Sequence, residues 1–263
     1  MNLLIVGAGA MGRWVADTVD ADVAFLDRDA DAAETAAEAV EGRVVPVDTE
    51  ERFDAVCLAV PMSAVTDTIE VYAPLAEQAV FDITGVMAPP VAAMREHAPD
   101  CERVSFHPLF APRNAPGNVA VVADEPGPVT DAVRDDMTAT DNHVFETTVE
   151  EHDEAMETVQ ASAHTAVLAY ALAAGDVREE FATPVSAGLR DLVETVTDGS
   201  PEVYAEIQSV FDGADDVAAA AAQIAAADDD EFEGLYHDAA RHFDARASDL
   251  PADTADVQEE AER

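Results

Sequence analysis

Lysine is missing from this chain of 263 residues, so its basic side chains are 13 arginines. Without lysine no Schiff base can form, and without clustered basic side chains a nucleic-acid partner is disfavoured. Cysteine is almost as scarce: Cys57 and Cys101 show no C-x-x-C spacing, so neither a disulfide framework nor a metal site is predicted. No apolar run approaches the roughly 18 residues of a membrane span. Because the chain opens on an apolar strand without a basic region before it, we expect a cytoplasmic protein that binds no membrane.

Acidic side chains, by contrast, are abundant. The 56 Asp and Glu residues give a formal net charge of −43. At about 1 M salt the screening length falls to roughly 3 Å, so such a charge is tolerable there and harmful in dilute buffer. We interpret the charge as adaptation to high salt. The alternative interpretation is an acidic surface that docks a basic partner.

The first part of the chain alternates short β-rich runs with Ala-rich helical stretches. This alternation is typical of βαβ units and predicts a mainly parallel sheet in an α/β Rossmann-type domain over residues 1–148. The expected strands are Asn2–Val6, Val23–Leu26, Val44–Pro46, Ala55–Val60, Ala79–Ile83, Arg103–His107, Val119–Ala123 and Asn142–Phe145.

The second part has apolar residues at three- and four-residue spacing, which predicts an all-α domain over residues 149–246. The expected helices are Glu150–Ala174, Glu179–Thr197, Pro201–Ala227 and Glu231–Ala245. The last residues, 247–263, have many charges and few apolar side chains, so we expect an acidic flexible tail.

A glycine fingerprint follows the first strand directly. Gly7 permits a tight turn, Gly9 lets the backbone approach a pyrophosphate, and Gly12 permits close packing of helix on strand. The intervening Ala8, Ala10 and Met11 would present backbone N–H groups to the phosphates. A glycine turn between a strand and a helix can also be purely structural, so the fingerprint needs its context.

Asp27 supplies that context, because it ends the second strand twenty residues after Gly7. A carboxylate there accepts hydrogen bonds from the adenosine ribose and repels the 2′-phosphate of NADP, so NAD is the predicted cofactor. Arg28 beside it keeps NADP open as the alternative. Val60 and Pro61, after the expected strand Ala55–Val60, complete the predicted cofactor site.

Two histidines stand out as candidates for acid–base chemistry. His107 closes a strand just before Pro108, and residues at the carboxyl end of such strands point into the ligand crevice. His164 shares a helix face with Gln160, and a polar pair in an apolar helix must be hydrogen-bonded or face a ligand. His152, in an acidic stretch, is instead expected to cap a helix.

These residues carry a resemblance to the prephenate dehydrogenase family, which includes arogenate dehydrogenases. The run Ser105–Pro112 resembles the family's H-P-M-F-G-P motif, whose histidine is catalytic, and Gln160-x-x-x-His164 resembles its helical Q-x-x-x-H motif. Glu151–Asp153 and Ser200–Ile207 are similar to further family segments. The likeness covers about residues 1–210 and implies a catalytic His107, with His164 and Gln160 on the substrate.

The chain departs from the family pattern at two places. Where the family shows D-x-x-S-V-K, this chain has Asp82–Met87, so the serine and the lysine are replaced, and Thr84 is the nearest hydroxyl. The family's arginine for the substrate carboxylate is also missing, since position 195 is Thr. Arg190 and Arg113 are the candidates for that role, because guanidinium binds carboxylates in a bidentate way.

The resemblance implies NAD-dependent oxidative decarboxylation of prephenate to 4-hydroxyphenylpyruvate, in tyrosine biosynthesis. The alternatives are arogenate dehydrogenation, another small hydroxy-acid dehydrogenase, or a non-catalytic NAD sensor. A β-hydroxyacid dehydrogenase is disfavoured, because those enzymes use a catalytic lysine that this chain lacks. By analogy with dehydrogenases of this layout, the helical domain is expected to form a homodimer.

Overall fold

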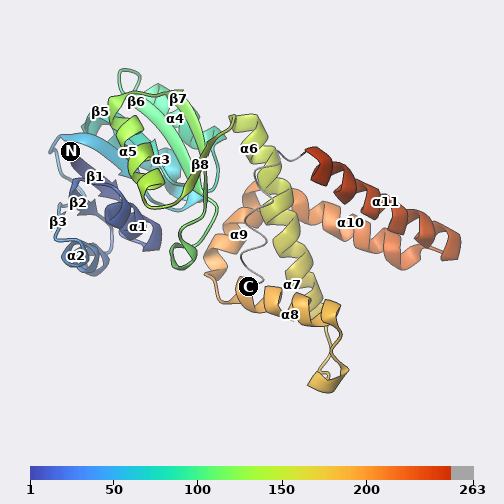
Figure 1. Cartoon of the computed structure of the whole chain (residues 1–263). Helices are drawn as coiled ribbons and strands as arrows, with labels where there is room; N and C mark the ends of the chain where they lie inside the picture. Colours follow the sequence, from blue (N-terminus) through green and yellow to red (C-terminus); the bar gives the residue numbers. More distant parts are fainter. Residues whose placement is uncertain (250–263) are drawn as a thin grey trace. The chain divides into compact units, whose positions relative to one another are not determined.

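A mixed sheet forms the first part of the computed structural model, which describes residues 1–249 and the side chains of residues 1–242. The sheet has 8 strands in the order β3-β2-β1-β4-β5-β6-β7-β8 (Figure 1). All neighbouring pairs are parallel except β6 and β7. The strands are β1 Asn2–Val6, β2 Asp22–Leu26, β3 Arg43–Val44, β4 Phe53–Leu58, β5 Ala76–Asp82, β6 Glu102–Pro108, β7 Asn118–Glu125 and β8 His143–Glu146. The predicted Rossmann-type sheet is confirmed.

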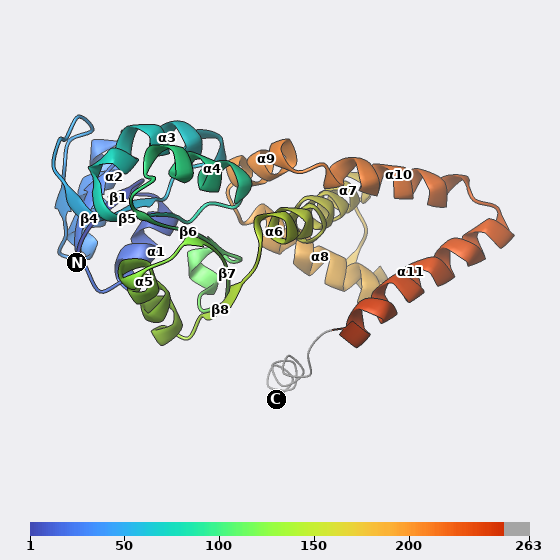
Figure 2. The same cartoon turned by 90° about the horizontal axis from the view of Figure 1, so that it is seen from above.

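Helices cover both faces of this sheet. They are α1 Ala10–Thr18, α2 Ala30–Ala39, α3 Val65–Tyr72, α4 Ala88–His97 and α5 Pro128–Ala139. Apolar side chains of α1, α2 and α5 form one core with the sheet, and those of α3 and α4 form another. Figure 2 shows α3 and α4 on one side, with α1 and α5 on the other. Strand residues therefore alternate between two closed cores, as a doubly wound sheet requires.

The chain after β8 is helical, as predicted, but the bounds of each helix differ from the expected ones. The predicted Glu150–Ala174 helix consists of α6 Val149–Met156, a π-helical turn η4 Glu157–Ser162, and α7 Ala163–Ala173. After a short 3-10 turn, η5 Glu179–Phe181, helix α8 spans Pro184–Thr197. It starts later than expected because Thr183 caps it, accepting the N–H of Ser186, and Pro184 suits a first helical position.

The expected long helix Pro201–Ala227 is wrong in one respect, because it is broken. Helix α9 spans Pro201–Val210, and α10 spans Gly213–Ala226. A Cβ on Gly213 would lie 2.2 Å from the carbonyl oxygen of Glu157, and the hydroxyl of Ser162 donates to the carbonyl of Gly213 over 3.1 Å. The chain turns here so that its backbone can pack against η4.

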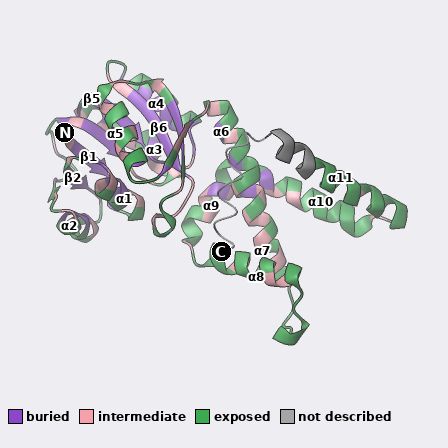
Figure 3. Ribbon diagram, in the orientation of Figure 1, coloured by how far each residue is buried: buried purple, intermediate pink, exposed green. Residues whose placement is uncertain are grey.

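Burial is uneven along the chain. The sheet strands are largely buried, whereas helix α7 has no fully buried residue although its sequence is strongly apolar (Figure 3). A small core of Val86, Met156, Ala161, Ile207 and Phe211 joins α6, η4 and α9 to the loop after β5. The helical part therefore leaves much apolar surface uncovered.

The chain divides into two compact units on either side of Gly213. The second unit contains most of α10 and α11 Asp229–Asp249, which includes the predicted helix Glu231–Ala245. Of the predicted tail, residues 247–249 belong to α11, and residues 250–263 lie outside the described residues. Among residues 1–249, no helix combines the length and apolarity that crossing a bilayer requires.

Candidate active site

The glycine turn lies between β1 and α1, at the centre of the sheet. Gly7 has φ +107°, and its N–H donates to the carbonyl of Leu26 over 2.8 Å. A Cβ at this position would lie 2.2 Å from the carbonyl oxygen of Ala59, which follows β4. Position 7 therefore requires glycine for two reasons, the left-handed backbone and the close approach of the β4 loop.

The other two fingerprint glycines serve different purposes. A Cβ on Gly12 would lie 2.0 Å from the carbonyl oxygen of Gly7, so Gly12 is needed for helix α1 to pack against the turn. A Cβ on Gly9 would meet nothing within 4 Å. The fold itself does not require glycine at position 9, whereas a pyrophosphate crossing the helix N-terminus does.

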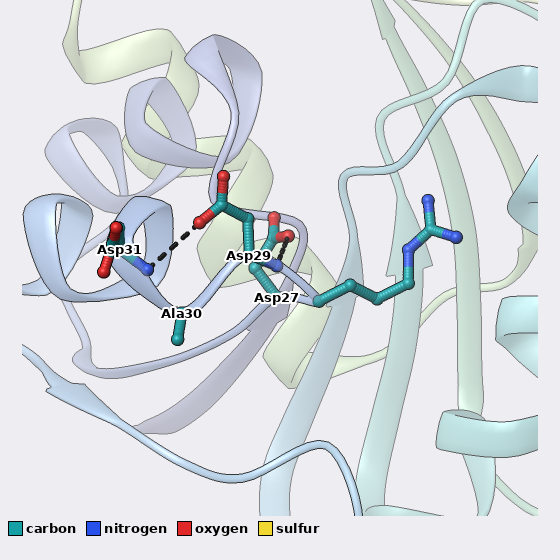
Figure 4. A pocket seen from close by; sticks show the side chains of 5 residues that line it. Asp27, Asp29, Ala30 and Asp31 are labelled. Atoms are coloured by element: carbon teal, nitrogen blue, oxygen red, sulfur yellow. Dashed lines mark hydrogen bonds between the residues drawn. The ribbon is translucent and has the colours of Figure 1, made fainter.

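Asp27 is fixed at the end of β2 by its neighbours. Its Oδ2 accepts the N–H of Ala8 over 2.7 Å, and its Oδ1 accepts the N–H of Asp29 over 2.9 Å. An open pocket of about 730 Å³ is lined by the run Asp27–Asp31 (Figure 4). Each carboxylate oxygen has a further lone pair for a ribose hydroxyl. Arg28 lines the same pocket and is exposed.

The remaining predicted cofactor residues surround the glycine turn. Ala10 and Met11 begin α1, and no side chain caps this helix end. Val60 lies 3.4 Å from the Cβ position of Gly7, so the loop after β4 borders the turn directly. Pro61 is exposed and precedes a 3-10 turn, η1 Met62–Ala64. The structure thus brings Asp27 and Val60 against the glycine turn.

His107 lies at the carboxyl end of β6, on the face that carries α3 and α4, and is 6% exposed. Burial, with a smaller contribution from neighbouring His152, lowers the pKa of His107 to about 3, so the imidazole is neutral at physiological pH. A Cβ on Gly85 would lie 3.5 Å from its Nε2. Within the described part of the chain this nitrogen has no hydrogen-bond partner. His107 therefore presents a free ring nitrogen to the loop after β5.

His152 is where the sequence prediction is wrong. It does not cap a helix in solvent: it is 2% exposed, and its Nε2 lies 2.8 Å from Nδ1 of His107 in a hydrogen bond. The cap of α6 is Thr148, which accepts the N–H of Glu151. The Nδ1 of His152 in turn hydrogen-bonds Oδ1 of Asp153 over 2.7 Å. Helix α6 contacts α4, which brings His152 over the end of β6.

Asp153 also joins α6 to the loop after β5. Its two oxygens accept the N–H groups of Met87 and Ala88, each over 3.1 Å, at the start of α4. Partial burial raises the pKa of Asp153, but hydrogen bonds from His152 and these two amides outweigh it and the pKa is lowered. Asp153 is therefore a carboxylate that accepts hydrogen bonds on both sides.

A second carboxylate of the helical part binds the sheet edge in the same way. Glu206, on α9, accepts the N–H of Met62 over 3.1 Å and that of Ser63 over 3.3 Å, and it also accepts the Ser63 hydroxyl. Sequence reasoning did not assign Glu206 a role. Only its place in the family-like segment Ser200–Ile207 could have indicated one.

Beneath this edge lies a fully buried carboxyl group, Asp82, at the end of β5. Burial raises its pKa from 3.8 to about 7, against the opposing hydrogen bonds from Thr84. Its Oδ1 accepts the N–H and hydroxyl of Thr84 over 3.0 and 2.6 Å. Ser105 lies opposite Asp82 on β6. Among the described residues, neither Oδ2 of Asp82 nor Oγ of Ser105 has a hydrogen-bond partner. The hydroxyl of Thr84 therefore already donates a hydrogen bond to Asp82.

The helical polar pair lies at the π-helical turn. Gln160 belongs to η4, and His164 follows in α7. The Oε1 of Gln160 and the Nδ1 of His164 are buried without a hydrogen-bond partner among the described residues. The His164 ring packs edge-on against Tyr204 of α9, with centroids 4.7 Å apart, and burial lowers its pKa. Unpaired buried acceptors beside a π turn are typical of a site that a ligand completes.

The two candidate arginines are placed differently from these groups. Arg113 follows β6 in a 3-10 turn, η3 Pro112–Asn114, and forms an ion pair with Asp198 at 3.5 Å. Arg190, in the middle of α8, is exposed and has no hydrogen bond or ion pair within the described residues. Among the described residues, neither arginine forms a hydrogen bond with His107, Gln160 or His164.

A glycine turn at a helix N-terminus, a carboxylate ending the next strand and a buried histidine at the carboxyl edge of the sheet together define a nucleotide-dependent oxidoreductase. The sequence model of the prephenate dehydrogenase nucleotide-binding domain matches residues 15–123. The 4-amino-4-deoxyprephenate dehydrogenase of Streptomyces pristinaespiralis is 30% identical over 233 residues, which covers 81% of this chain and 78% of that protein. The chain belongs to the prephenate dehydrogenase family.

Solved structures agree with this assignment. Prephenate dehydrogenase from A. aeolicus, in complex with hydroxyphenyl propionate and NAD⁺, has a TM-score of 0.64 at 14% identity, covering 100% of this chain and 96% of that one. Arogenate dehydrogenase from Synechocystis has a TM-score of 0.61 at 15% identity, covering 95% and 100%. These structures confirm the predicted fold, and the family model identifies residues 15–123 as nucleotide-binding.

Proposed function

We propose that this protein is an NAD-dependent prephenate dehydrogenase, which converts prephenate to 4-hydroxyphenylpyruvate and CO₂. The observation that carries the proposal is the neutral, buried His107, whose free Nε2 faces the loop after β5 at the carboxyl edge of the sheet. A base at this edge, with a dinucleotide turn on the same edge, is the arrangement that oxidation of a hydroxyl group needs.

NAD⁺ supplies the hydride acceptor when it is bound. Nε2 of His107 accepts the proton of the substrate C4 hydroxyl as the hydride leaves C4. The bond to the ring carboxylate then breaks, its electron pair makes the ring aromatic, and CO₂ departs. Protonated His107 returns its proton to the phenolate oxygen. Prephenate and NAD⁺ thus yield 4-hydroxyphenylpyruvate, CO₂ and NADH without net release of a proton.

The preference for NAD over NADP follows from Asp27. Its carboxylate is fixed by the amides of Ala8 and Asp29, so it cannot swing away to admit a 2′-phosphate. The negative charge would repel that phosphate at close range. Arg28 is exposed beside it and makes no ion pair within the described chain, so its side chain is the competing feature that a comparison of NAD with NADP tests.

The helical pair supports a substrate with several oxygens. The Nδ1 of His164 and Oε1 of Gln160 are buried and unpaired, and they belong to the helix that continues from α6, which carries His152. We assign them to positioning of the substrate. Arg190 and Arg113 remain the proposed cations for its carboxylates, and Arg190 is the one without an existing ion pair.

A second candidate substrate comes from the S. pristinaespiralis relative, whose name specifies an amino group at C4 in place of the hydroxyl. Oxidation of that substrate would use the same base and the same hydride acceptor. Arogenate is the third, because it differs from prephenate only in its side-chain amino group. The choice of prephenate over the 4-amino compound rests on His107, since a neutral imidazole in a buried site suits an uncharged hydroxyl better than an ammonium group.

The deciding experiment follows NADH formation by absorbance in molar KCl, with NAD⁺ and each of the three substrates in turn. We expect turnover with prephenate, at the highest kcat/KM. Faster turnover of either amino compound would reassign the substrate. Silence with all three, together with measurable NAD binding, would support the alternative of a non-catalytic NAD sensor.

We also propose that the protein is a homodimer and that the second copy covers α7, η5 and α8. These elements carry large apolar side chains that are exposed in the single chain: Leu172, Phe181, Val185 and Leu192. An apolar patch of this kind, rimmed by polar residues, is typical of an association surface. The high charge supports a further part of the proposal, that the protein works in concentrated salt, where repulsion among its carboxylates is screened.

A further inference from the structure

Three side chains form a hydrogen-bonded chain that ends at the base. Asp153 Oδ1 lies 2.7 Å from His152 Nδ1, and His152 Nε2 lies 2.8 Å from His107 Nδ1. The two histidines are buried, whereas the side chain of Asp153 is 23% exposed. The chain therefore joins the buried base to a carboxylate at the edge of the site.

We propose that Asp153 and His152 are positioning residues that hold His107 in the tautomer with its proton on Nδ1 and its lone pair on Nε2. Their kinetic role rests on the function proposed above, whereas the tautomer itself does not. The pair also shares the positive charge that develops on His107 when Nε2 accepts a proton. The base is thus a unit of three residues.

The first step of the argument concerns the proton between Asp153 and His152. Asp153 is a carboxylate, because hydrogen bonds from His152 and from the amides of Met87 and Ala88 lower its pKa despite partial burial. A carboxylate can only accept. The proton in this hydrogen bond therefore lies on Nδ1 of His152.

The second step concerns the proton between the two histidines. A positive charge on the pair is disfavoured in the resting enzyme, since both rings are buried away from water. His152, with its single proton on Nδ1, has a lone pair on Nε2. His107 must then donate from Nδ1, which leaves its Nε2 free beside Gly85.

The third step concerns the charge during the reaction. When Nε2 of His107 accepts the substrate proton, the imidazolium donates a stronger hydrogen bond to His152, which in turn donates to Asp153. The charge of Asp153 raises the pKa of His107, in opposition to burial and to His152. Asp82, buried at the end of β5, is the further acidic group beneath this edge. The carboxylate of Asp153 thus favours the protonated base at the moment it forms.

The tautomer can be read without any substrate. In ¹⁵N-labelled protein in molar KCl, long-range nitrogen–proton correlation distinguishes protonated from bare ring nitrogens, and loss of one signal set in His107→Asn assigns His107. We expect a proton on Nδ1 of His107 in the wild type and a larger share of the Nε2-protonated ring in Asp153→Asn, because an amide nitrogen in place of Oδ1 donates to His152 and reverses the chain, although it gives up the hydrogen bond from the Met87 N–H. A proton on Nε2 of wild-type His107 would overturn the inference.

Kinetics measure what the pair contributes. We expect kcat of Asp153→Asn to fall about 100-fold, within the range of general-base catalysis, with little change in KM or NAD affinity. Glu206→Gln is the matched control, because Glu206 also accepts two backbone amides at the sheet edge but forms no hydrogen bond with a histidine of the described chain. Glu206→Gln should leave the His107 tautomer unchanged. If both variants lose stability alike and neither changes the tautomer, Asp153 is only a helix cap and the inference fails.

A pair of His152 variants guards against misfolding of Asp153→Asn. The amide oxygen of His152→Gln can accept from Nδ1 of His107 while its amide nitrogen donates to Asp153, whereas His152→Phe keeps a ring and removes both hydrogen bonds. We expect the glutamine variant to keep the Nδ1 tautomer and at least tenfold more kcat than the phenylalanine variant. Equal activities would overturn the inference. A correct tautomer in an enzyme that oxidises none of the three substrates would sink the proposed function alone.

Discussion

The sheet part and the helical part of the first compact unit differ in how far they bury their apolar side chains. Residues 1–146 enclose two apolar cores, one on each face of the sheet, and hold fully buried Phe25, Phe53, Phe81 and Phe106. Helices α6 and α9 and the turn η4 share one small core, and α7 has no fully buried residue. The sheet part is complete as a single chain, whereas the helical part needs something more to cover its apolar side chains.

The same contrast holds for the polar atoms of the site. On the sheet part, His107 and Asp27 are fixed by hydrogen bonds to neighbours. On the helical part, Oε1 of Gln160 and Nδ1 of His164 are buried and unpaired among the described residues. The sheet part is thus preorganised for its cofactor, whereas Gln160 and His164 have polar atoms that a substrate would have to satisfy. The predictions below separate the two parts, from the largest expected effect to the smallest.

The base on the sheet part should carry the largest effect. We expect His107→Asn to lower kcat by about 10²–10⁴-fold, because asparagine cannot accept the substrate proton. NAD affinity should change little, since the cofactor residues lie around the glycine turn instead. Steady-state kinetics and titration with NAD⁺ measure the two quantities separately. Near-normal turnover would remove His107 from the mechanism.

The buried carboxyl group Asp82 should make stability depend on pH. Its folded pKa of about 7 lies above the unfolded value of 3.8, so this group favours the folded state at low pH and progressively loses that benefit as the pH rises to about 7. At about 1.4 kcal/mol per tenfold change in the proton equilibrium, the loss amounts to roughly 4 kcal/mol.

Asp82→Asn removes this loss, since an amide stays neutral and can still accept from Thr84. We expect the variant to be more stable than the wild type at pH 8 by up to roughly 4 kcal/mol, with the difference vanishing near pH 4. Denaturant unfolding at both pH values, in the same salt, measures it. A difference that does not depend on pH would mean that Asp82 is ionised in the folded protein at low pH.

The uncovered helical surface should respond to a charge. We expect Leu172→Glu to weaken dimerisation by about 10- to 100-fold, because Leu172 is 89% exposed in the single chain and burying a leucine contributes roughly 1.5–3 kcal/mol. Sedimentation in molar KCl gives the dissociation constant. Val71→Glu is the matched control, since Val71 is 59% exposed on α3 of the sheet part. Equal effects of both, or none from Leu172, would contradict the proposed surface.

The glycine turn offers the smallest and most selective test. We expect Gly9→Ala to weaken NAD binding about tenfold, which corresponds to about 1.4 kcal/mol, without a change in stability. A Cβ at position 9 meets no protein atom within 4 Å, so it can clash only with a bound ligand. Gly7→Ala should instead destabilise the fold, since its Cβ would overlap the carbonyl of Ala59. Loss of stability in Gly9→Ala would assign that glycine to the fold.

The sheet part was predictable because its signals are local. The central strands are short apolar runs between turn residues, and the glycine fingerprint specifies its own geometry. The place of His107 at a strand end was also visible in the sequence. His152 was not, because its acidic neighbours resemble a solvated helix start. The only signal was the spacing of His152 and Met156, four residues apart, which together form the buried side of α6.

The helical part was less predictable because packing between distant segments shapes it. The break between α9 and α10 exists because Gly213 contacts Glu157, 56 positions earlier in the chain, and no local pattern reports this contact. The π-helical turn at Gln160 belongs to the same contact region. The substrate arginine is a further case: the sequence offers candidates, but among the described residues neither Arg190 nor Arg113 hydrogen-bonds the polar pair.

The lack of lysine has a counterpart in the way carboxylates find partners. With 56 acids and 13 arginines, most carboxylates have no cation available, and the structure supplies peptide dipoles as surrogate counter-ions. Asp27, Asp153 and Glu206 each accept two backbone N–H groups, and Glu102 of β6 likewise accepts two from the start of α5. A backbone N–H group is fixed in place, whereas a charged side chain can be replaced as a partner by dissolved chloride or potassium. We therefore expect these carboxylate–amide hydrogen bonds to remain stabilising in concentrated salt, where exposed ion pairs are screened.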